Sequence, residues 1–318
     1  VHPALSWLRC ACFLAGEYTG GFEGRSALCR YRNGRRHGLR AIGRLRVLND
    51  LYQQLDPIAF AVGPLTVRWY GIAYVLGFVC AGFVLYFTAK RWKVRFDIDS
   101  LLTVMICAML GVILGGRLGY VLFYGDGYYL QHPLEILATN HGGMSFHGGL
   151  IGALVGGIVA ARLTHVPYLT LADLGCIAAP IGLFFGRCAN FVNGELWGAP
   201  TDLPWGVVFG GAAGSMPRHP SQLYEAFLEG IVIFAVLFVL SRKVPPRPRG
   251  TFMGLFLILY GTFRIVAEFV REPDAQLGYL WGGWLTMGQL LSLPLVLAGI
   301  CILAYAVKMK LPQKGVAE

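Results

Sequence analysis

Seven long apolar stretches constrain the fold of this chain more than any other feature of its sequence. A transmembrane helix needs about 20 predominantly apolar residues. Seven stretches meet that need: Trp69–Thr88, Leu101–Tyr124, Phe146–Leu163, Leu169–Phe185, Leu223–Leu240, Phe252–Val270 and Met287–Lys308. The chain is 56% hydrophobic and 14% charged, which excludes an ordinary soluble domain. The stretches are continuously apolar, not alternating, which disfavours a β-barrel.

We therefore predict an all-α, polytopic membrane protein with seven transmembrane helices. The fourth stretch is the least secure, because it contains Asp173 and Pro180.

The loops between the stretches differ in charge, and this difference predicts an orientation. Lys and Arg collect after the first, third, fifth and seventh stretches, in residues 90–95, at Arg162, in residues 242–249 and in residues 308–314. The alternate loops carry mainly acidic residues. Short loops rich in Lys and Arg stay in the cytoplasm. The sequence thus predicts that the mature N-terminus lies outside and the C-terminus, with a tail at 311–318, lies in the cytoplasm.

Residues 1–46 conflict with that orientation, since they hold nine Arg against two Glu. They contain no apolar signal-peptide core joined to a cleavage site, and Met105, inside the second stretch, is the first Met. We expect translation to begin near Val47 or Leu48 and residues 1–46 to be upstream sequence, so that residues 47–310 form the seven-helix domain. A disordered basic tail is the alternative. Without this segment the chain is only weakly basic, so its charge does not indicate nucleic-acid binding.

Polar side chains gather at the ends of the stretches that this orientation places outside: Tyr70, His147, Arg187, Glu195, Tyr224, Arg264 and Glu268. Charge at membrane depth is costly, so such residues are candidates for a functional site. Because they converge from separate helices, they indicate a reaction centre at a membrane surface.

His147 follows a glycine-rich run, residues 141–149, at the outer end of the third stretch. An imidazole can accept a proton at neutral pH; a structural His at the membrane interface is the alternative. Glycines recur every fourth residue from Gly148 to Gly156 and from Gly111 to Gly119. Small residues at that spacing let helices approach closely, so we interpret these glycines as packing positions.

A polar block, residues 186–198, follows the fourth stretch. Arg187, Asn190, Asn193 and Glu195 lie within nine residues of one another. A lone Arg there would extend to the lipid headgroups, but two amides and a carboxylate beside it favour a hydrogen-bonded cluster. Fixed donors of this kind suit an anionic phosphate.

Two more segments contribute candidates. Residues 218–225 contain His219 and Tyr224, although an aromatic membrane anchor is the ordinary explanation for Tyr224. In the sixth stretch Tyr260, Arg264 and Glu268 lie four residues apart and share one helix face. Arg264 and Glu268 either merely neutralise each other or belong to a site. Replacing such a buried pair by apolar residues often costs no stability, which favours a functional role.

Together, residues 141–152, 186–198, 218–225 and 260–268 resemble the bacterial prolipoprotein diacylglyceryl transferase family. The resemblance extends over roughly residues 56–305. It is most specific in residues 186–198, which follow the family pattern of Gly-Arg, Asn-Phe, Asn, Glu and Gly. Residues 1–46 have no counterpart. The resemblance implies seven spans with the N-terminus outside, and a small periplasmic head at residues 190–220.

The resemblance also implies the reaction, which is the first step of lipoprotein maturation in the bacterial inner membrane. The sn-1,2-diacylglyceryl group of phosphatidylglycerol moves to the lipobox cysteine thiol of a prolipoprotein signal peptide, forming a thioether and releasing glycerol phosphate. His147 is the implied general base, with the Arg264/Glu268 pair as the alternative. Arg187 and Arg264 are implied to hold the phosphate. The remaining implied site residues are Tyr70, Asn190, Asn193, Glu195, His219, Tyr224, Tyr260 and Glu268.

We expect no cofactor, because the diacylglyceryl group arrives already esterified to phosphate, and the sequence shows no nucleotide or metal motif. A small-solute transporter is the alternative function. It predicts polar residues at every depth, whereas the inner halves of the stretches are apolar apart from Asp173. A phospholipid hydrolase is a third possibility, but the chain has neither a Gly-x-Ser-x-Gly elbow nor an HExxH motif.

Overall fold

The computed structural model describes residues 47–63, 65–124, 128–137, 143–272, 278 and 280–313. Residues 47–318 form one compact unit. The expectations for residues 1–46 lie outside the described residues, as do His141, Gly142 and residues 314–318 of the predicted tail.

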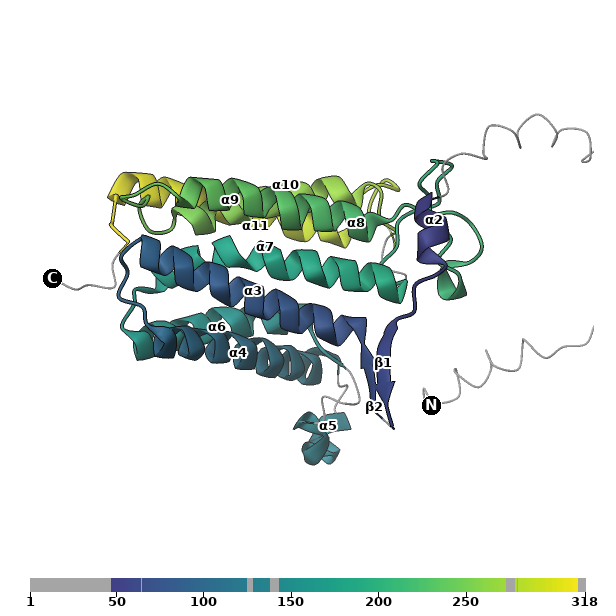
Figure 1. The fold of residues 1–318 in the computed structure, drawn as a ribbon, viewed down its shortest axis with the longest axis horizontal. Helices are drawn as coiled ribbons and strands as arrows, with labels where there is room; N and C mark the ends of the chain where they lie inside the picture. The colour runs from purple at the N-terminus through teal and green to yellow at the C-terminus, as the bar shows by residue number, and fades with distance from the viewer. Residues whose placement is uncertain are drawn as a thin grey trace, which may run out of the picture. The chain divides into compact units, whose positions relative to one another are not determined.

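Seven helical segments are long and apolar enough to cross a membrane, which confirms the predicted fold class. They are α3 (Trp69–Arg91), α4 (Ile98–Tyr124), α6 (Phe146–Thr164), α7 (Tyr168–Asn193), the run of α8 (Ser221–Glu225), η7 (Ala226–Val232) and α9 (Ile233–Ser241), α10 (Thr251–Glu268) and α11 (Met287–Met309). Figure 1 shows these helices running alongside one another. The η7 segment is a π-helix, so the fifth span is continuous but irregular.

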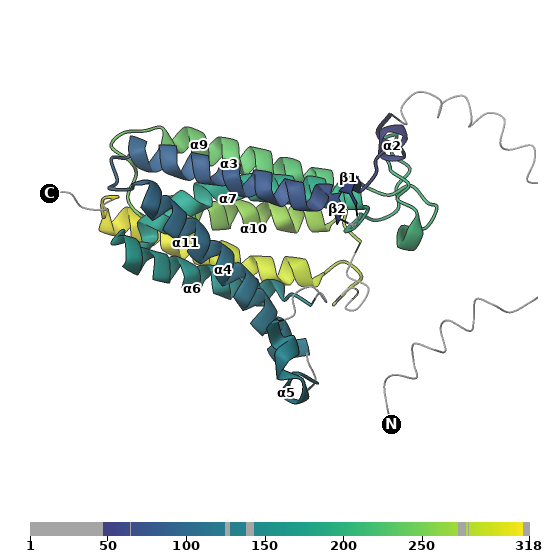
Figure 2. The ribbon, with the colours of Figure 1, turned by 60° about the horizontal axis from the view of Figure 1, so that its bottom comes forward.

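Several short elements lie at the end of the bundle where α3 begins and α7 ends (Figures 1 and 2). They are α2 (Val47–Tyr52), the antiparallel strands β1 (Ile58–Val62) and β2 (Leu65–Arg68), α5 (Tyr128–Gln131), and the 3₁₀ helices η4 (Pro133–Leu137) and η6 (Gly211–Ala213). The hairpin is an addition to the all-α architecture that the sequence predicts. We call this end the hairpin end.

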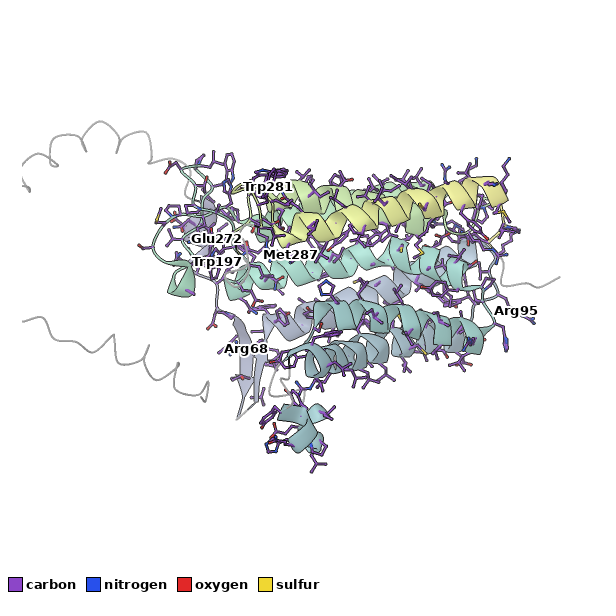
Figure 3. All side chains as sticks on the ribbon, turned by 180° about the vertical axis from the view of Figure 1, so that it is seen from behind. Arg68, Arg95, Trp197, Glu272, Trp281 and Met287 are labelled. Carbon is purple, nitrogen blue, oxygen red and sulfur yellow. The ribbon has the colours of Figure 1, made fainter. Side chains whose placement is uncertain are left out.

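The opposite end of the bundle carries the connections at residues 92–97, 165–167 and 242–250, and we call it the basic end. Figure 3 shows Arg68, Trp197, Glu272 and Trp281 at the hairpin end, and Arg95 at the basic end. The loops that the sequence predicts to be basic therefore all lie together.

Helix α7 is longer than the sequence predicts. It ends at Asn193, about two turns beyond Phe185. Pro180 lies inside the helix without ending it, and Gly194, with φ of 66°, closes it in the left-handed conformation. Arg187, Asn190 and Asn193 therefore lie on a helix, not in a loop after it. In the sequence these polar residues mark the end of an apolar stretch. In the structure they remain helical and contact other protein side chains.

Asp173 explains how a carboxylate is accommodated within α7. It is fully buried and accepts hydrogen bonds from the backbone N–H groups of Gly250 and Met253, each at 2.8 Å, and from Gln313 Nε2 at 2.5 Å. These N–H groups lie at the start of α10, which has no side-chain cap of its own. The first N–H groups of a helix need an external acceptor. Asp173 supplies it from a neighbouring helix.

The glycine positions join α4 to α6, as the sequence predicts. A Cβ atom on Gly115 would lie 2.7 Å from the Cα of Gly152, and one on Gly119 would lie 2.8 Å from the Cα of Gly148. Figures 1 and 2 show the two helices side by side. The two backbones are in direct contact, so there is no room for side chains at these positions.

The apolar core occupies the part of the bundle near the basic end. Leu174, Ile177, Leu237 and Phe252 are fully buried there, where α7, α9 and α10 meet. Many large apolar side chains on the outer faces of the helices are exposed instead, as expected of a surface that contacts lipid. Most of the apolar core thus lies toward the basic end, with Asp173 buried beside it, and a larger cluster of charged side chains lies at the hairpin end.

Candidate functional site

Six charged side chains form a buried cluster at the hairpin end: Arg187 of α7, Glu225 of α8, Glu229 of η7, Arg264 and Glu268 of α10, and Arg271 just beyond α10. Glu225 lies at its centre. Its carboxylate is 2.6 Å from Arg187 Nε, 2.9 Å from an Arg264 Nη atom and 3.3 Å from an Arg271 Nη atom. One carboxylate therefore holds three guanidinium groups from two different helices and the segment after α10.

The other two carboxylates occupy different positions in the cluster. Glu268 lies 2.9 Å from Arg264 one turn earlier on α10, so the pair that the sequence predicts does form. Glu229 is 3.7 Å from Arg187 and 4.0 Å from Arg264. Among the described residues, neither Glu229 oxygen has a hydrogen-bond partner. Glu229 also lies in the π-helical segment, and such segments are frequent at functional sites.

The cluster exposes its cations and buries its anions. The Glu225 and Glu229 side chains are 1% and 0% exposed, whereas those of Arg187 and Arg264 are 16% and 13% exposed. Burying six charges is expensive, and a structural role alone would be served as well by apolar residues. The accessible guanidinium edges can accept a further anion, because Arg presents several N–H donors in a planar fork.

A second group connects the end of α7 to the start of α8. The Glu195 carboxylate accepts hydrogen bonds from Asn190 at 2.8 Å and Asn193 at 3.5 Å, while its backbone carbonyl accepts one from Gln222 at 2.6 Å. Tyr70 of α3 bonds to the Tyr74 hydroxyl at 3.0 Å and lies within electrostatic range of Glu195 and Arg187. The polar block of residues 186–198 thus forms a cluster, and only Arg187 in it joins the six charges.

A third group attaches the segment 194–220 to α8. The Tyr224 hydroxyl accepts a hydrogen bond from Trp205 Nε1 at 2.7 Å and lies 3.2 Å from His219 Nδ1. Burial lowers the pKa of His219. His219 and Tyr224 are therefore neighbours, as their place in one short segment suggests.

Tyr260 and His147 complete the predicted set. Tyr260 is mostly buried, stacks on Phe256 with ring centroids 5.7 Å apart, and lies within electrostatic range of Glu229 and Arg264. It therefore belongs beside the six charges. His147 is the second residue of α6 and its side chain is exposed at the hairpin end. The preceding Ser145 caps α6 by accepting a hydrogen bond from the N–H of Gly148 at 3.3 Å.

Sequence reasoning assigned no role to Glu225 or Glu229, although both are charged residues in an apolar stretch. The rule that identified Arg264 and Glu268 identifies this pair too, since 225 and 229 are four residues apart on one helical face. Arg117 was also overlooked. It is 3% exposed on α4 and donates to the backbone carbonyls of Glu135 and Ile136 at 2.6 and 2.8 Å. It thereby holds η4 against α4.

Among the residues that the structure describes, no three His, Cys, Asp or Glu side chains are placed to hold a metal ion. The chemical groups that gather at the hairpin end are guanidinium, carboxylate, amide, phenol and imidazole groups.

Comparison with known proteins identifies the family. A family profile described as prolipoprotein diacylglyceryl transferase matches residues 57–305. The chain is 51% identical over 260 residues to the phosphatidylglycerol–prolipoprotein diacylglyceryl transferase of Methylocella silvestris, covering 80% of this chain and 95% of the relative. Its identity to the protein of the same name from Geobacter sulfurreducens is 49% over 249 residues, covering 78% and 94%. The chain is thus a multi-pass membrane protein that belongs to the prolipoprotein diacylglyceryl transferase family, and it is a diacylglyceryl-transferring enzyme.

Proposed function

We propose that this enzyme transfers the sn-1,2-diacylglyceryl group of phosphatidylglycerol to the lipobox cysteine of prolipoprotein signal peptides. The names of the relatives supply the two substrate classes. The observation that carries the proposal for the site is the position of Arg187 and Arg264, which share the Glu225 carboxylate at 2.6 and 2.9 Å. Family membership gives no support to the transporter alternative.

In this proposal Arg187 and Arg264 hold the phosphate of the lipid. Glu225 keeps the two guanidinium groups close together despite their mutual repulsion, and their partly exposed edges face the incoming anion. The phosphodiester gains a second negative charge when it leaves as glycerol phosphate. Fixed cations aimed at a leaving group that gains charge lower the barrier of the reaction.

The reaction balances as a displacement at the glyceryl carbon. The cysteine sulfur forms a bond to that carbon while the carbon–oxygen bond to phosphate breaks, and the electron pair leaves with the phosphate oxygen. The thiol proton must pass to a base, since the thiolate is the nucleophile. The products are a thioether-linked prolipoprotein and glycerol phosphate.

We assign the base to His147 and a positioning role to Glu268. The imidazole of His147 is exposed at the hairpin end, where a peptide thiol can reach it. The Glu268 carboxylate is 6% exposed and already paired with Arg264 at 2.9 Å, so it is poorly placed to take a proton from a peptide. This assignment predicts that His147→Gln loses transfer while it retains lipid binding.

The remaining predicted residues would line the lipid headgroup. Tyr70 and Tyr260 flank the arginines from α3 and α10, and we propose that they orient the lipid. Asn190, Asn193 and Glu195 would contact the headgroup glycerol. His219 and Tyr224 would complete the headgroup site from the segment 194–220, whose hydrogen bonds connect it to α8.

We further propose that the hairpin end faces the periplasm of a bacterial cell whose inner membrane holds the seven spans. Lys90, Arg95, Arg162, Arg242 and Lys308 all lie at the basic end or close to it, and Lys and Arg in short loops mark the cytoplasmic side. The N-terminus of the helical body would then be periplasmic and the C-terminus cytoplasmic. Residues 190–220 would belong to the periplasmic head.

A transfer assay tests the proposal directly. The full chain is incubated with phosphatidylglycerol labelled in its acyl chains and with a lipobox peptide. Label should move to the peptide, and Arg187→Gln or Arg264→Gln should each reduce the rate by on the order of 10²–10³. Arg95→Gln is the matched control, because Arg95 is exposed at the basic end, away from the cluster (Figure 3). Release of free lipid instead of labelled peptide, or normal rates in both variants, would contradict the proposal.

A further inference from the structure

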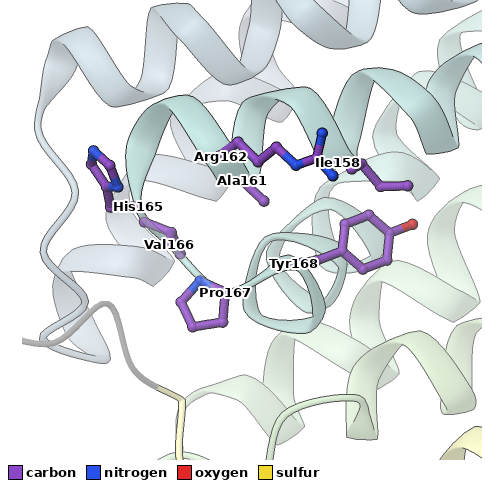
Figure 4. A pocket seen from close by; sticks show the side chains of 7 residues that line it. All are labelled: Ile158, Ala161, Arg162, His165, Val166, Pro167 and Tyr168. Carbon is purple, nitrogen blue, oxygen red and sulfur yellow. The ribbon is translucent and has the colours of Figure 1, made fainter.

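A second candidate binding site lies at the basic end, at the opposite end of the bundle from the residues assigned above. A pocket of about 520 Å³ opens between the end of α6 and the start of α7, which is within the usual range for a ligand site. Ile158, Ala161, Val166 and Pro167 supply apolar walls, and Arg162, His165 and Tyr168 supply polar groups (Figure 4). A lining that is apolar with a few convergent polar groups is typical of a binding site.

Two donors in this pocket point the same way. Figure 4 shows the Arg162 guanidinium and the Tyr168 hydroxyl both extending toward the Ile158 side of the pocket. The ring of Tyr168 is fixed against α6, since a Cβ atom on Gly157 would lie 3.2 Å from its Cε2. An Arg on a helix points back toward the helix N-terminus, so this guanidinium lies alongside the last turns of α6.

Arg162 differs from Arg187, Arg264 and Arg117 at the hairpin end, because no described residue accepts a hydrogen bond from its guanidinium. Arg187 and Arg264 are held by carboxylates, and Arg117 by backbone carbonyls. Within the part of the chain that the structure describes, no carboxylate or other acceptor engages the guanidinium of Arg162 or the hydroxyl of Tyr168. The pocket therefore presents two unengaged donors above apolar walls.

The charge around the pocket selects the kind of ligand. The connections at the basic end carry Lys93, Arg95, Arg242 and Lys243, which are all exposed. Lys and Arg near a membrane surface attract anionic lipids, and basic pockets between transmembrane helices bind their headgroups. An amphiphile with a phosphate and acyl chains matches donors at the mouth and an apolar face along α6.

We propose that the pocket between α6 and α7 binds the headgroup of an anionic phospholipid from the leaflet at the basic end. The Arg162 guanidinium and the Tyr168 hydroxyl donate to its phosphate, and an acyl chain lies along Ile158. This lipid is not consumed. It occupies a site separate from the hairpin end, where the reacting lipid binds under the proposed function.

Native mass spectrometry of the purified full chain can test this proposal. The protein is mixed with phosphatidylserine, or with phosphatidylcholine as the neutral comparison, and retained lipid is counted. We expect Arg162→Gln to weaken retention of phosphatidylserine about tenfold, as loss of a charge-assisted hydrogen bond does. Arg95→Gln removes the same charge at the same end but outside the pocket (Figure 3), so it should retain lipid like the unmodified chain.

Further variants separate this site from the catalytic one. Arg264→Gln should retain the phosphatidylserine that Arg162→Gln loses, and Arg162→Gln should transfer diacylglyceryl groups normally with saturating phosphatidylglycerol. Arg162→Lys keeps the positive charge but lacks the planar guanidinium, so it should retain an intermediate amount of phosphatidylserine. This variant replaces Arg162→Gln in the experiment if the Gln variant does not fold. Equal retention by Arg162→Gln and the unmodified chain, or equal retention of phosphatidylcholine, would overturn the proposal. Failure of the transfer assay would leave this result unaffected.

Discussion

Glu225 is the residue on which the arrangement of the site depends. It contacts three guanidinium groups, it is almost completely buried, and its two oxygens divide the arginines between them. Without its charge, Arg187, Arg264 and Arg271 would face one another with only Glu268 and the more distant Glu229 in compensation. We therefore expect a single buried carboxylate to set both the stability of this region and the spacing of Arg187 and Arg264, the two groups proposed to hold the phosphate.

Replacing Glu225 and Glu229 separately tests this view. Glu225→Gln should lower the free energy of unfolding by about 3–5 kcal/mol, because it leaves buried charges uncompensated. Glu229→Gln should cost much less, since its ion pairs at 3.7 and 4.0 Å are long. Thermal unfolding of both variants in detergent gives the comparison. An equal cost for the two substitutions would show that Glu225 is not the centre of the cluster.

His219 should make the stability of the segment 194–220 depend on pH. Burial lowers its pKa, so the unfolded chain binds a proton more readily than the folded one. Burial of the neutral imidazole therefore contributes fully to stability above the unfolded pKa of about 6.5, and the contribution is lost as the pH falls from that value to the lower folded pKa. We expect the melting temperature of the unmodified chain to exceed that of His219→Gln at pH 8, and the gap to narrow toward pH 5. A constant gap would count against this role.

At the residue scale the sequence indicated the two central arginines of the cluster but not the carboxylate that holds them. Arg187 attracts notice because it begins a polar block, and Arg264 because it lies four residues before Glu268 in an apolar stretch. Glu225 and Glu229 lie in a span that otherwise shows only apolar residues, and their importance depends on which helices pack beside them. Helix neighbours cannot be read from the hydropathy of one stretch. The division of roles between His147 and Glu268 stays a prediction.

Helix packing in this bundle relies on two different devices. Between α4 and α6 the backbones touch at glycines, whereas α10 begins at a carboxylate supplied by α7. The first device was readable from the four-residue spacing of the glycines. The second was not, because Asp173 appeared only as a defect in an apolar stretch. Its partners, Gly250 and Met253, lie about 80 residues away along the chain.

The glycine contact predicts a contrast between two Gly→Ala substitutions. Gly152→Ala should destabilise the protein by about 1–3 kcal/mol, because the added methyl group forces α4 and α6 apart. Gly175→Ala is the matched control in α7, where a Cβ atom would meet nothing within 4 Å. There the higher helix propensity of Ala should stabilise by up to about 1 kcal/mol. Thermal unfolding of both variants measures these changes in stability. An unchanged melting temperature in Gly152→Ala would contradict close contact between the α4 and α6 backbones.

The cap on α10 predicts a local effect as well as a global one. Asp173→Asn replaces one acceptor oxygen by an N–H donor group facing other N–H donors, which should cost about 1–3 kcal/mol. Amide hydrogen exchange should rise first at residues 250–254. Asp202→Asn, at an exposed position in the segment 194–220, should change neither quantity. Unchanged exchange at the start of α10 in Asp173→Asn would show that another group caps the helix.

The length of α7 shows where hydropathy fails at the scale of an element. Hydropathy ends this helix near Phe185 because Arg187, Asn190 and Asn193 follow. In the structure these residues stay helical, since Glu225, Glu195 and their neighbours satisfy them within the protein. The residue at which an apolar stretch ends and the residue at which the helix ends are therefore not the same in α7. They coincide for α6, whose predicted and observed ends differ by one residue.

At the scale of the whole bundle, the six-charge cluster and most of the apolar core lie toward opposite ends, with Asp173 as a buried charge beside the core. The basic end holds the apolar core around Leu174 and Phe252, and the hairpin end holds six buried charges. We expect the apolar core to keep water from crossing to the site from the basic end. Transfer instead of hydrolysis requires that water be kept from the reacting lipid.

The proposed orientation can be tested by labelling single cysteines in intact cells. The background variant replaces Cys10, Cys12 and Cys29 by Ser. The five described cysteines lie on membrane-spanning helices and are free. Short loops rich in Lys and Arg remain in the cytoplasm, so the basic end should be cytoplasmic and the hairpin end periplasmic. Asp202→Cys at the hairpin end should therefore react with a membrane-impermeant maleimide added outside the inner membrane. Arg95→Cys at the basic end should react only after the membrane is permeabilised. The background variant alone reports any reaction of the cysteines in the spans. The reverse pattern, with Arg95→Cys labelled first, would place the six-charge site on the cytoplasmic side.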